Sequence, residues 1–123
     1  MRFTAPAVAA IMIALAAPAH ADGDPTAGEV VFKRNCAVCH TTEAGKNKIG
    51  PSLHGVVGRP SASLPDFTYS DAMKAANKTW DPATLDTYLT SPRGLVPGTK
   101  MIFLGLKAEA DRQNVIAYLE SQK

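Results

Sequence analysis

The chain has 123 residues, which is enough for one domain and short for two. Its composition, 46% hydrophobic and 20% charged with 9 Gly and 9 Pro, is that of a globular protein rather than a disordered chain or a repeat array. The formal net charge of +2 is too small to indicate a class of partner, so the placement of individual charges is more informative than their sum.

The N-terminus has the layout of a secretory signal peptide. A single arginine precedes residues 5–19, which carry no charge, and an A-x-A cleavage site ends at Ala21. We therefore predict a cleaved signal peptide over residues 1–21, a mature domain over residues 22–123, and export to the periplasm. An uncleaved membrane anchor is the alternative. The apolar stretch, however, holds two prolines and is shorter than the ~20 residues that a spanning helix requires.

The first helix of the mature domain is predicted to begin at Pro25. Asp24 is a favourable N-cap, and proline is favoured at the first helical position. Phe32 contributes to an apolar side of this helix, which should continue to about Cys36 or Cys39.

Cys36 and Cys39 are the only two cysteines, and with His40 they form the sequence C-x-x-C-H. This sequence is the attachment motif of c-type haem. Two thiols three residues apart lie on one face of a helical turn and can reach both vinyl groups of a porphyrin, while the next residue directs its imidazole at the iron. A disulfide and a redox-active dithiol are alternatives in an exported protein, whereas a zinc site lacks a second pair of ligands at the usual spacing.

Residues 41–65 are rich in Gly, Pro and Ser and show no clear period. They predict an irregular loop region, which is acceptable at this length if the loop wraps a cofactor. A short helix is predicted next, over residues 70–76, with Ser70 as its cap.

A longer helix is predicted to begin at Pro82, with Asp81 as its cap, and to end at Pro92. Residues 91–105 are predicted to be loop, and a final helix with an apolar stripe is predicted over residues 108–121. Strand patterns are absent from the sequence, so we predict an all-α fold of about four to five short helices and long loops.

The second iron ligand separates an enzyme from a carrier, because a haem bound by His40 alone keeps one side of the iron open. The candidates in the mature chain are His54, Met73 and Met101. Met101 follows a Pro-Gly turn in an otherwise irregular loop, a context that packing explains poorly, so we predict that it is the ligand. His54 is predicted to bond a backbone carbonyl, and Met73 to pack.

The chain resembles the class I c-type cytochromes, which include mitochondrial cytochrome c and its soluble bacterial periplasmic relatives. The resemblance extends from about Gly23 to Leu119, and the matching motifs occur in the family's order. They are Gly28 and Phe32, Cys36-Ala37-Val38-Cys39-His40, Gly50-Pro51-Ser52-Leu53-His54-Gly55, Gly58-Arg59, Phe67-Thr68-Tyr69-Ser70, Trp80, Leu85, Tyr88-Leu89, Pro92, Val96-Pro97-Gly98-Thr99-Lys100-Met101, Phe103 and Val115-Ile116-Ala117-Tyr118-Leu119.

The resemblance implies one covalent haem c in a class I cytochrome c fold whose N- and C-terminal helices cross. Cys36 and Cys39 would form the thioethers, and His40 and Met101 would be the axial ligands of the iron. The Pro51 carbonyl would accept a hydrogen bond from His40 and orient its ring.

Other residues would support the haem pocket. Arg59, Tyr69 and Trp80 would hold the buried propionates, which need charge-assisted hydrogen bonds in a dry interior. Tyr88 would lie near the Met101 sulfur. The supporting residues implied by the resemblance are Pro51, Arg59, Tyr69, Trp80, Tyr88, Thr99 and Phe103.

The predicted function is outer-sphere transfer of single electrons without enzymatic catalysis, because two filled axial positions keep substrates off the iron. Cations around the haem edge would steer the protein toward acidic surfaces of redox partners such as a bc-type complex, a reaction centre, an oxidase or a dehydrogenase. The predicted partner-surface residues are Arg34, Lys46, Lys48, Arg93 and Lys100.

We expect a monomer that makes transient contacts with membrane proteins and binds no nucleic acid. Three alternatives are a peroxidase or gas-binding haem protein from which Met101 dissociates, an exported thiol–disulfide protein, and a haem domain tethered by an uncleaved N-terminus.

Overall fold

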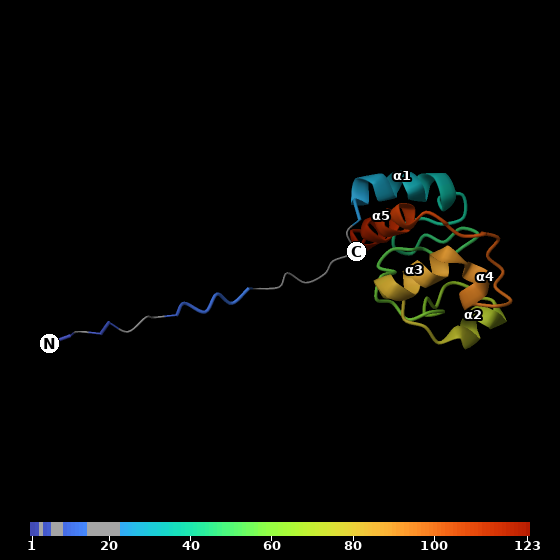
Figure 1. Cartoon of the computed structure of the whole chain (residues 1–123). Helices are drawn as coiled ribbons and strands as arrows, with labels where there is room; N and C mark the ends of the chain where they lie inside the picture. The colour runs from blue at the N-terminus through green and yellow to red at the C-terminus, as the bar shows by residue number, and fades with distance from the viewer. Residues whose placement is uncertain (3, 6–8, 15–22) are drawn as a thin grey trace.

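The computed structural model describes residues 1–2, 4–5, 9–14 and 23–123. Those residues form five helices and no sheet, apart from one antiparallel bridge between Pro60 and Thr79. In chain order the helices are α1 (Pro25–Asn35), α2 (Asp71–Ala76), α3 (Pro82–Thr90), α4 (Pro92–Leu95) and α5 (Glu109–Glu120) (Figure 1). The prediction of an all-α fold is confirmed.

The predicted cleavage site at Ala21 lies outside the described residues. Within the described part of the chain, no helix is both long and apolar enough to cross a membrane. The signal peptide over residues 1–21 therefore stays a prediction.

Side-chain caps determine where α1, α2 and α3 begin. Asp24, Ser70 and Asp81 each accept a hydrogen bond from a backbone N–H two or three residues further along the chain. These bonds satisfy N–H groups that have no partner inside the helix. α1 and α3 also start with proline, whose fixed φ suits the first helical turn. The predicted starts of these three helices are confirmed.

The loop predicted over residues 91–105 contains a short helix, α4, and in this respect the prediction is wrong. The Ser91 hydroxyl accepts a hydrogen bond from the Gly94 N–H at 3.2 Å and caps the new turn. Pro92 ends α3, as predicted, because it offers no N–H to continue the helix, but it also occupies the favoured first position of α4.

α1 packs across α5 on one side of the molecule (Figure 1). Gly28 permits the close approach, because a Cβ atom there would overlap the Asn114 carbonyl and lie 2.8 Å from the Tyr118 Cβ. The rings of Phe32 and Tyr118 pack with their centroids 5.5 Å apart, and the Asp24 N–H donates to Asn114 Oδ1 at 2.9 Å. The predicted crossing of the N- and C-terminal helices is confirmed.

A buried apolar core connects this crossing to α3, and α2, α3 and α4 lie on the other side of α5 from α1 (Figure 1). Cys36, Met101 and Phe103 are half-buried and pack against this core, which attaches the two segments of functional interest to it. The buried apolar side chains are Val31, Phe32, Val56, Trp80, Leu85, Tyr88, Leu89, Val96, Leu106, Val115, Ile116 and Leu119.

Candidate functional site

The two cysteines lie on a turn that continues from the end of α1. The N–H groups of Cys39 and His40 both donate to the Cys36 carbonyl, at 3.1 and 2.9 Å. Both cysteines are half-buried free thiols, not paired in a disulfide. The turn therefore presents two thiols and an imidazole from one short stretch of backbone, which is the arrangement that covalent haem attachment requires.

The acidity of Cys36 argues against the thiol–disulfide alternative. Burial raises the pKa of the Cys36 thiol to about 11, and the neighbouring Cys39 adds to the rise. Reactive cysteines in C-x-x-C motifs have the opposite property, a lowered pKa that supplies the nucleophilic thiolate. Before haem is attached, burial therefore disfavours the thiolate of Cys36 that a redox-active motif needs.

The imidazole of His40 is held in one orientation by the backbone of the following loop. Its Nδ1 lies 2.7 Å from the Pro51 carbonyl oxygen, and a carbonyl can only accept, so Nδ1–H is the donor. The Nε2 lone pair is consequently available to a metal. Burial lowers the pKa of His40, although the bond to Pro51 acts in the opposite direction, so the ring favours the neutral form that binds metals.

Gly50 allows this loop to lie against the imidazole. Its N–H donates to the Cys39 carbonyl at 2.8 Å, which brings the loop next to the cysteine turn. A Cβ atom at position 50 would lie only 2.7 and 2.8 Å from Nδ1 and Nε2 of His40, so any larger residue would displace the ring. The motif match includes Gly50, but only the structure shows this steric reason for it.

Arg59 fastens the segment that carries Pro51. Its guanidinium donates to the backbone carbonyls of Ser52 at 3.0 Å and His54 at 3.1 Å. Burial lowers the pKa of Arg59, and nearby Tyr69 opposes that change. The expected role of Arg59 at a propionate stays a prediction, and its two observed bonds give it a further role in holding the loop.

Three other polar contacts tie the same loop. His54 Nδ1 lies 3.1 Å from the Thr42 carbonyl, which is the backbone partner predicted for a loop imidazole. Ser52 is 2% exposed, its hydroxyl donates to the Glu43 carbonyl, and its N–H donates to Asn47 Oδ1 at 2.8 Å. Sequence reasoning did not identify Ser52 and Asn47 as supports, because nothing local in their surroundings indicates a partner.

Tyr69 lies just before α2, and Trp80 lies just before α3. The N–H of Trp80 donates to the Arg59 carbonyl at 2.9 Å, so the chain segments that carry these two residues lie side by side. The Trp80 ring is buried, with its centroid 4.8 Å from that of Tyr88. The Tyr69 hydroxyl accepts from the Leu64 N–H at 3.2 Å.

Met101 is held from two sides. The Tyr88 hydroxyl donates to its Sδ at 3.6 Å, which is the proximity expected from the resemblance. The Met101 N–H donates to the Thr99 hydroxyl at 3.3 Å. Burial raises the pKa of Tyr88, although Thr99 opposes the rise, so the phenol keeps the proton that it donates. Met73 instead packs half-buried against the core, as predicted.

The residues in this region fit a covalent haem. Two thiols can form the thioether bonds to the porphyrin, and an imidazole with a free Nε2 and a methionine thioether are ligands typical of haem iron. Half-buried apolar side chains around the core can cover a porphyrin, and they include Leu53, Val57, Ala72, Met73, Ala76, Leu95, Met101 and Phe103.

The five predicted partner-surface residues are all exposed. Lys48 lies beside the cysteine turn, because its Nζ donates to the Ala37 carbonyl at 2.6 Å. Lys46 pairs with Glu43 at 2.8 Å, which reduces its net contribution to the local field. The other three are Arg34, Arg93 and Lys100.

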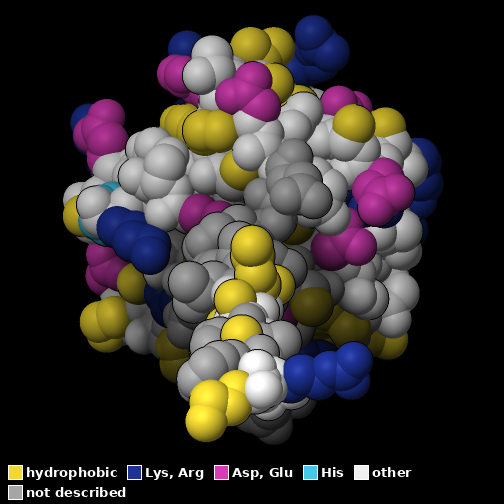
Figure 2. Space-filling model, turned by 60° about the vertical axis from the view of Figure 1, so that its left-hand side comes forward, with side chains coloured by type: hydrophobic (Ala, Val, Ile, Leu, Met, Phe, Trp, Pro, Cys, Tyr) yellow, Lys and Arg dark blue, Asp and Glu magenta, His cyan; other side chains and the backbone are white. Residues whose placement is uncertain are grey.

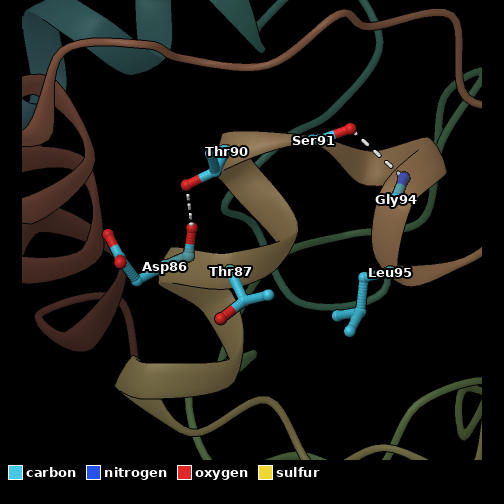
Figure 3. Close-up of a pocket in the computed structure, with 6 residues that line it drawn as sticks. All are labelled: Asp86, Thr87, Thr90, Ser91, Gly94 and Leu95. Carbon is cyan, nitrogen blue, oxygen red and sulfur yellow. Dashed lines mark hydrogen bonds between the residues drawn. The ribbon is translucent and has the colours of Figure 1, made fainter.

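An open pocket lies between α3 and α4 (Figure 3). The hydroxyls of Thr90 and Ser91 are already bonded within these helices, to the Asp86 carbonyl and the Gly94 N–H. Leu95 is the one lining residue that is also among the side chains able to cover a porphyrin, and neither the cysteines, His40 nor Met101 lines the pocket. Its lining residues are Asp86, Thr87, Thr90, Ser91, Gly94 and Leu95.

Comparison with known proteins decides the family, because the family model described as Cytochrome c matches residues 25–123. The chain belongs to the cytochrome c family. Cytochrome c2 of Rhodomicrobium vannielii is 52% identical over 107 residues, covering 86% of this chain and 85% of that protein. Cytochrome c2 of Rhodoblastus acidophilus is 52% identical over 102 residues, covering 82% of this chain and 94% of that protein.

A third relative is longer than this chain. The Rhodobacter capsulatus protein named cytochrome c-type cyt cy is 52% identical over 104 residues, which cover 85% of this chain and 52% of that protein. The chain thus spans about half the length of this relative and most of the length of the two cytochromes c2.

Family membership establishes the cofactor and the kind of function. The chain is a class I c-type cytochrome, and the C-x-x-C-H motif of Cys36, Cys39 and His40 attaches one covalent haem c. Like the family, the protein is a carrier of electrons. The resemblance inferred from the motifs is confirmed.

Proposed function

We propose that His40 Nε2 and Met101 Sδ are the two axial ligands of the haem iron, and that the protein shuttles single electrons between exported or membrane-bound redox partners. The proposal rests on the hydrogen bonds that hold these two side chains. The bond to Pro51 leaves only Nε2 of His40 free, and the Tyr88 hydroxyl holds the Met101 sulfur within the same core.

The residues that contact His40 and Met101 keep the geometry of the site unchanged while the electron moves. The haem, when bound, supplies the iron that accepts and releases one electron. The Pro51 carbonyl fixes the His40 ring, and Tyr88 fixes the Met101 thioether. A thioether is a soft ligand that favours reduced iron, so this ligand pair raises the reduction potential.

The same arrangement argues for a carrier rather than an enzyme. His40 and Met101 would hold the iron from both sides, so neither a peroxide nor a gas could coordinate unless Met101 left. The buried Tyr88 hydroxyl is bonded to Met101 and its burial disfavours ionisation, so it does not serve as a base. A peroxidase or gas-binding function would require a mobile Met101.

The proposed partners are redox proteins with acidic docking surfaces, such as a bc-type complex, a reaction centre, an oxidase or a dehydrogenase. Lys48 is the best-placed cation, because its Nζ is bonded next to the haem attachment turn. The face shown in Figure 2 mixes Lys and Arg with Asp and Glu, in keeping with the small net charge. Steering therefore depends on a few local cations rather than on the field of the whole protein.

The proposed location is the periplasm, reached through the signal peptide over residues 1–21. The C-x-x-C-H motif follows the predicted cleavage site, so the haem-binding residues remain in the exported part of the chain.

We expect the exported protein to begin at Asp22, because the A-x-A site ends at Ala21. The intact mass of the protein purified from its native host tests this expectation directly. A mass that includes residues 1–21 would instead support the membrane-tethered alternative.

Replacing Met101 with alanine is expected to open one side of the iron. The reduced Met101→Ala protein should bind carbon monoxide and shift its visible spectrum, whereas the reduced native protein should not. Met73→Leu is the matched control, because Met73 packs half-buried in α2 and should leave the spectrum unchanged. Equal binding of carbon monoxide by the native protein and by Met101→Ala would contradict methionine ligation.

Local steering by cations predicts a charge-dependent rate with small redox ions. Oxidation by the ferricyanide anion should slow as salt rises from ~0.01 M to ~0.15 M, because the screening length falls from about 30 Å to about 8 Å. Lys100→Gln, next to Met101, should weaken this salt dependence. Lys123→Gln, at the exposed C-terminus, is the control and should have less effect. The same effect from both variants would refute a local docking surface.

A further inference from the structure

The chain segment that follows Met101 is fastened to the end of α3. The Leu106 N–H donates to the Leu89 carbonyl at 2.7 Å. Gly105 has a φ of +108°, and a Cβ atom there would lie 2.9 Å from the same Leu89 carbonyl oxygen and overlap the Thr90 carbonyl. The backbone at Gly105 and Leu106 therefore lies directly on α3, in a position that only glycine permits at residue 105.

Arg112 in α5 fastens the same segment from the other side. Its Nη1 donates to the carbonyls of Leu106 and Lys107, both at 3.0 Å. Its Nε donates to Asp86 Oδ1 in α3 at 2.8 Å. One guanidinium thus joins α3, α5 and the exit of the Met101 segment.

This ion pair differs from the other two found among the described residues. The Arg112 side chain is 12% exposed and that of Asp86 is 35% exposed, whereas both members of each other pair are at least 44% exposed. Figure 3 shows the Asp86 carboxylate on the side of α3 that faces α5, away from Leu95. A pair that is shielded from water and makes charge-assisted hydrogen bonds contributes more than an exposed one.

Between Met101 and Leu106, Phe103 packs half-buried against the core. Lys107 Nζ donates to the Leu104 carbonyl at 3.2 Å and to the Thr90 carbonyl at 2.9 Å. Ile102 is 93% exposed and Leu104 is 77% exposed, so every second side chain points into solvent. On the N-terminal side, Val96 is 2% exposed and its carbonyl accepts from the Thr99 N–H at 3.1 Å. The Met101 segment is therefore a short span held between two anchors.

We propose that Asp86 and Arg112 are positioning residues for Met101, because their ion pair fixes the C-terminal anchor of this span and so determines how readily the sulfur leaves the iron. This inference rests on the proposed ligation by Met101. Opening of the span requires Leu106 to separate from α3, and the ion pair opposes that separation by holding the Leu106 carbonyl.

The test measures displacement of Met101 by added imidazole in the oxidised protein. Asp86→Asn removes the charge at nearly constant size, and we expect imidazole to bind about tenfold more tightly, as for the loss of a charge-assisted hydrogen bond. Arg112→Lys keeps the charge but loses the planar guanidinium that bonds Asp86 and the two carbonyls at the same time. Imidazole should therefore bind more tightly to this variant as well. Amide hydrogen exchange at Leu106 should accelerate in both variants relative to amides of α1.

Glu29→Gln is the matched control, because it breaks the exposed Lys33–Glu29 pair in α1, 2.9 Å long, and should leave imidazole affinity unchanged. If Asp86→Asn and Arg112→Lys lower the unfolding temperature but leave imidazole affinity and Leu106 exchange as in the native protein, the pair is a general stabiliser and the inference is wrong. A native oxidised protein without methionine-to-iron absorption would overturn the ligation proposal itself, which is a separate outcome.

Discussion

The hydrogen bond from His40 Nδ1 to the Pro51 carbonyl is the contact on which the rest of the site depends. It decides which ring nitrogen is free and in which direction that nitrogen points, while burial lowers the pKa of the ring and so favours its neutral form. The covalent motif can bring haem to the chain, but only an oriented imidazole gives the iron a defined ligand. Gly50 and Arg59 serve this one bond, the first by allowing the loop to approach the ring and the second by holding the loop's carbonyls.

The Met101 side of the site is held in a different way from the His40 side. Met101 lies on an extended span with alternate side chains in solvent, so its position depends on anchors at the two ends and on the Tyr88 hydroxyl. The α1–α5 crossing supplies a rigid frame behind both sides, with Val115 and Ile116 each 1% exposed. A carrier needs little rearrangement between oxidation states, and the two proposed ligands, His40 held by its loop and Met101 held by its anchors, would meet that need.

Much of this arrangement could be predicted from sequence because its signals are local. Asp24-Pro25 and Asp81-Pro82 identify helix starts without reference to the rest of the chain, and the C-x-x-C-H motif identifies the cofactor. α4 was missed because its cap is a serine before a proline that was expected only to end α3. The Asp86–Arg112 pair could not be predicted, since it exists only once α3 and α5 have packed together. The bonds of Arg59 to two backbone carbonyls depend in the same way on the path of an irregular loop.

The most direct test of the account is the visible spectrum of the oxidised native protein at neutral pH. Ligation by His40 and Met101 predicts a weak red band from sulfur bound to ferric iron, together with a sharp α-band after reduction. A haem spectrum that lacks the red band would contradict the account, because it would show that the Met101 sulfur is not bound opposite His40.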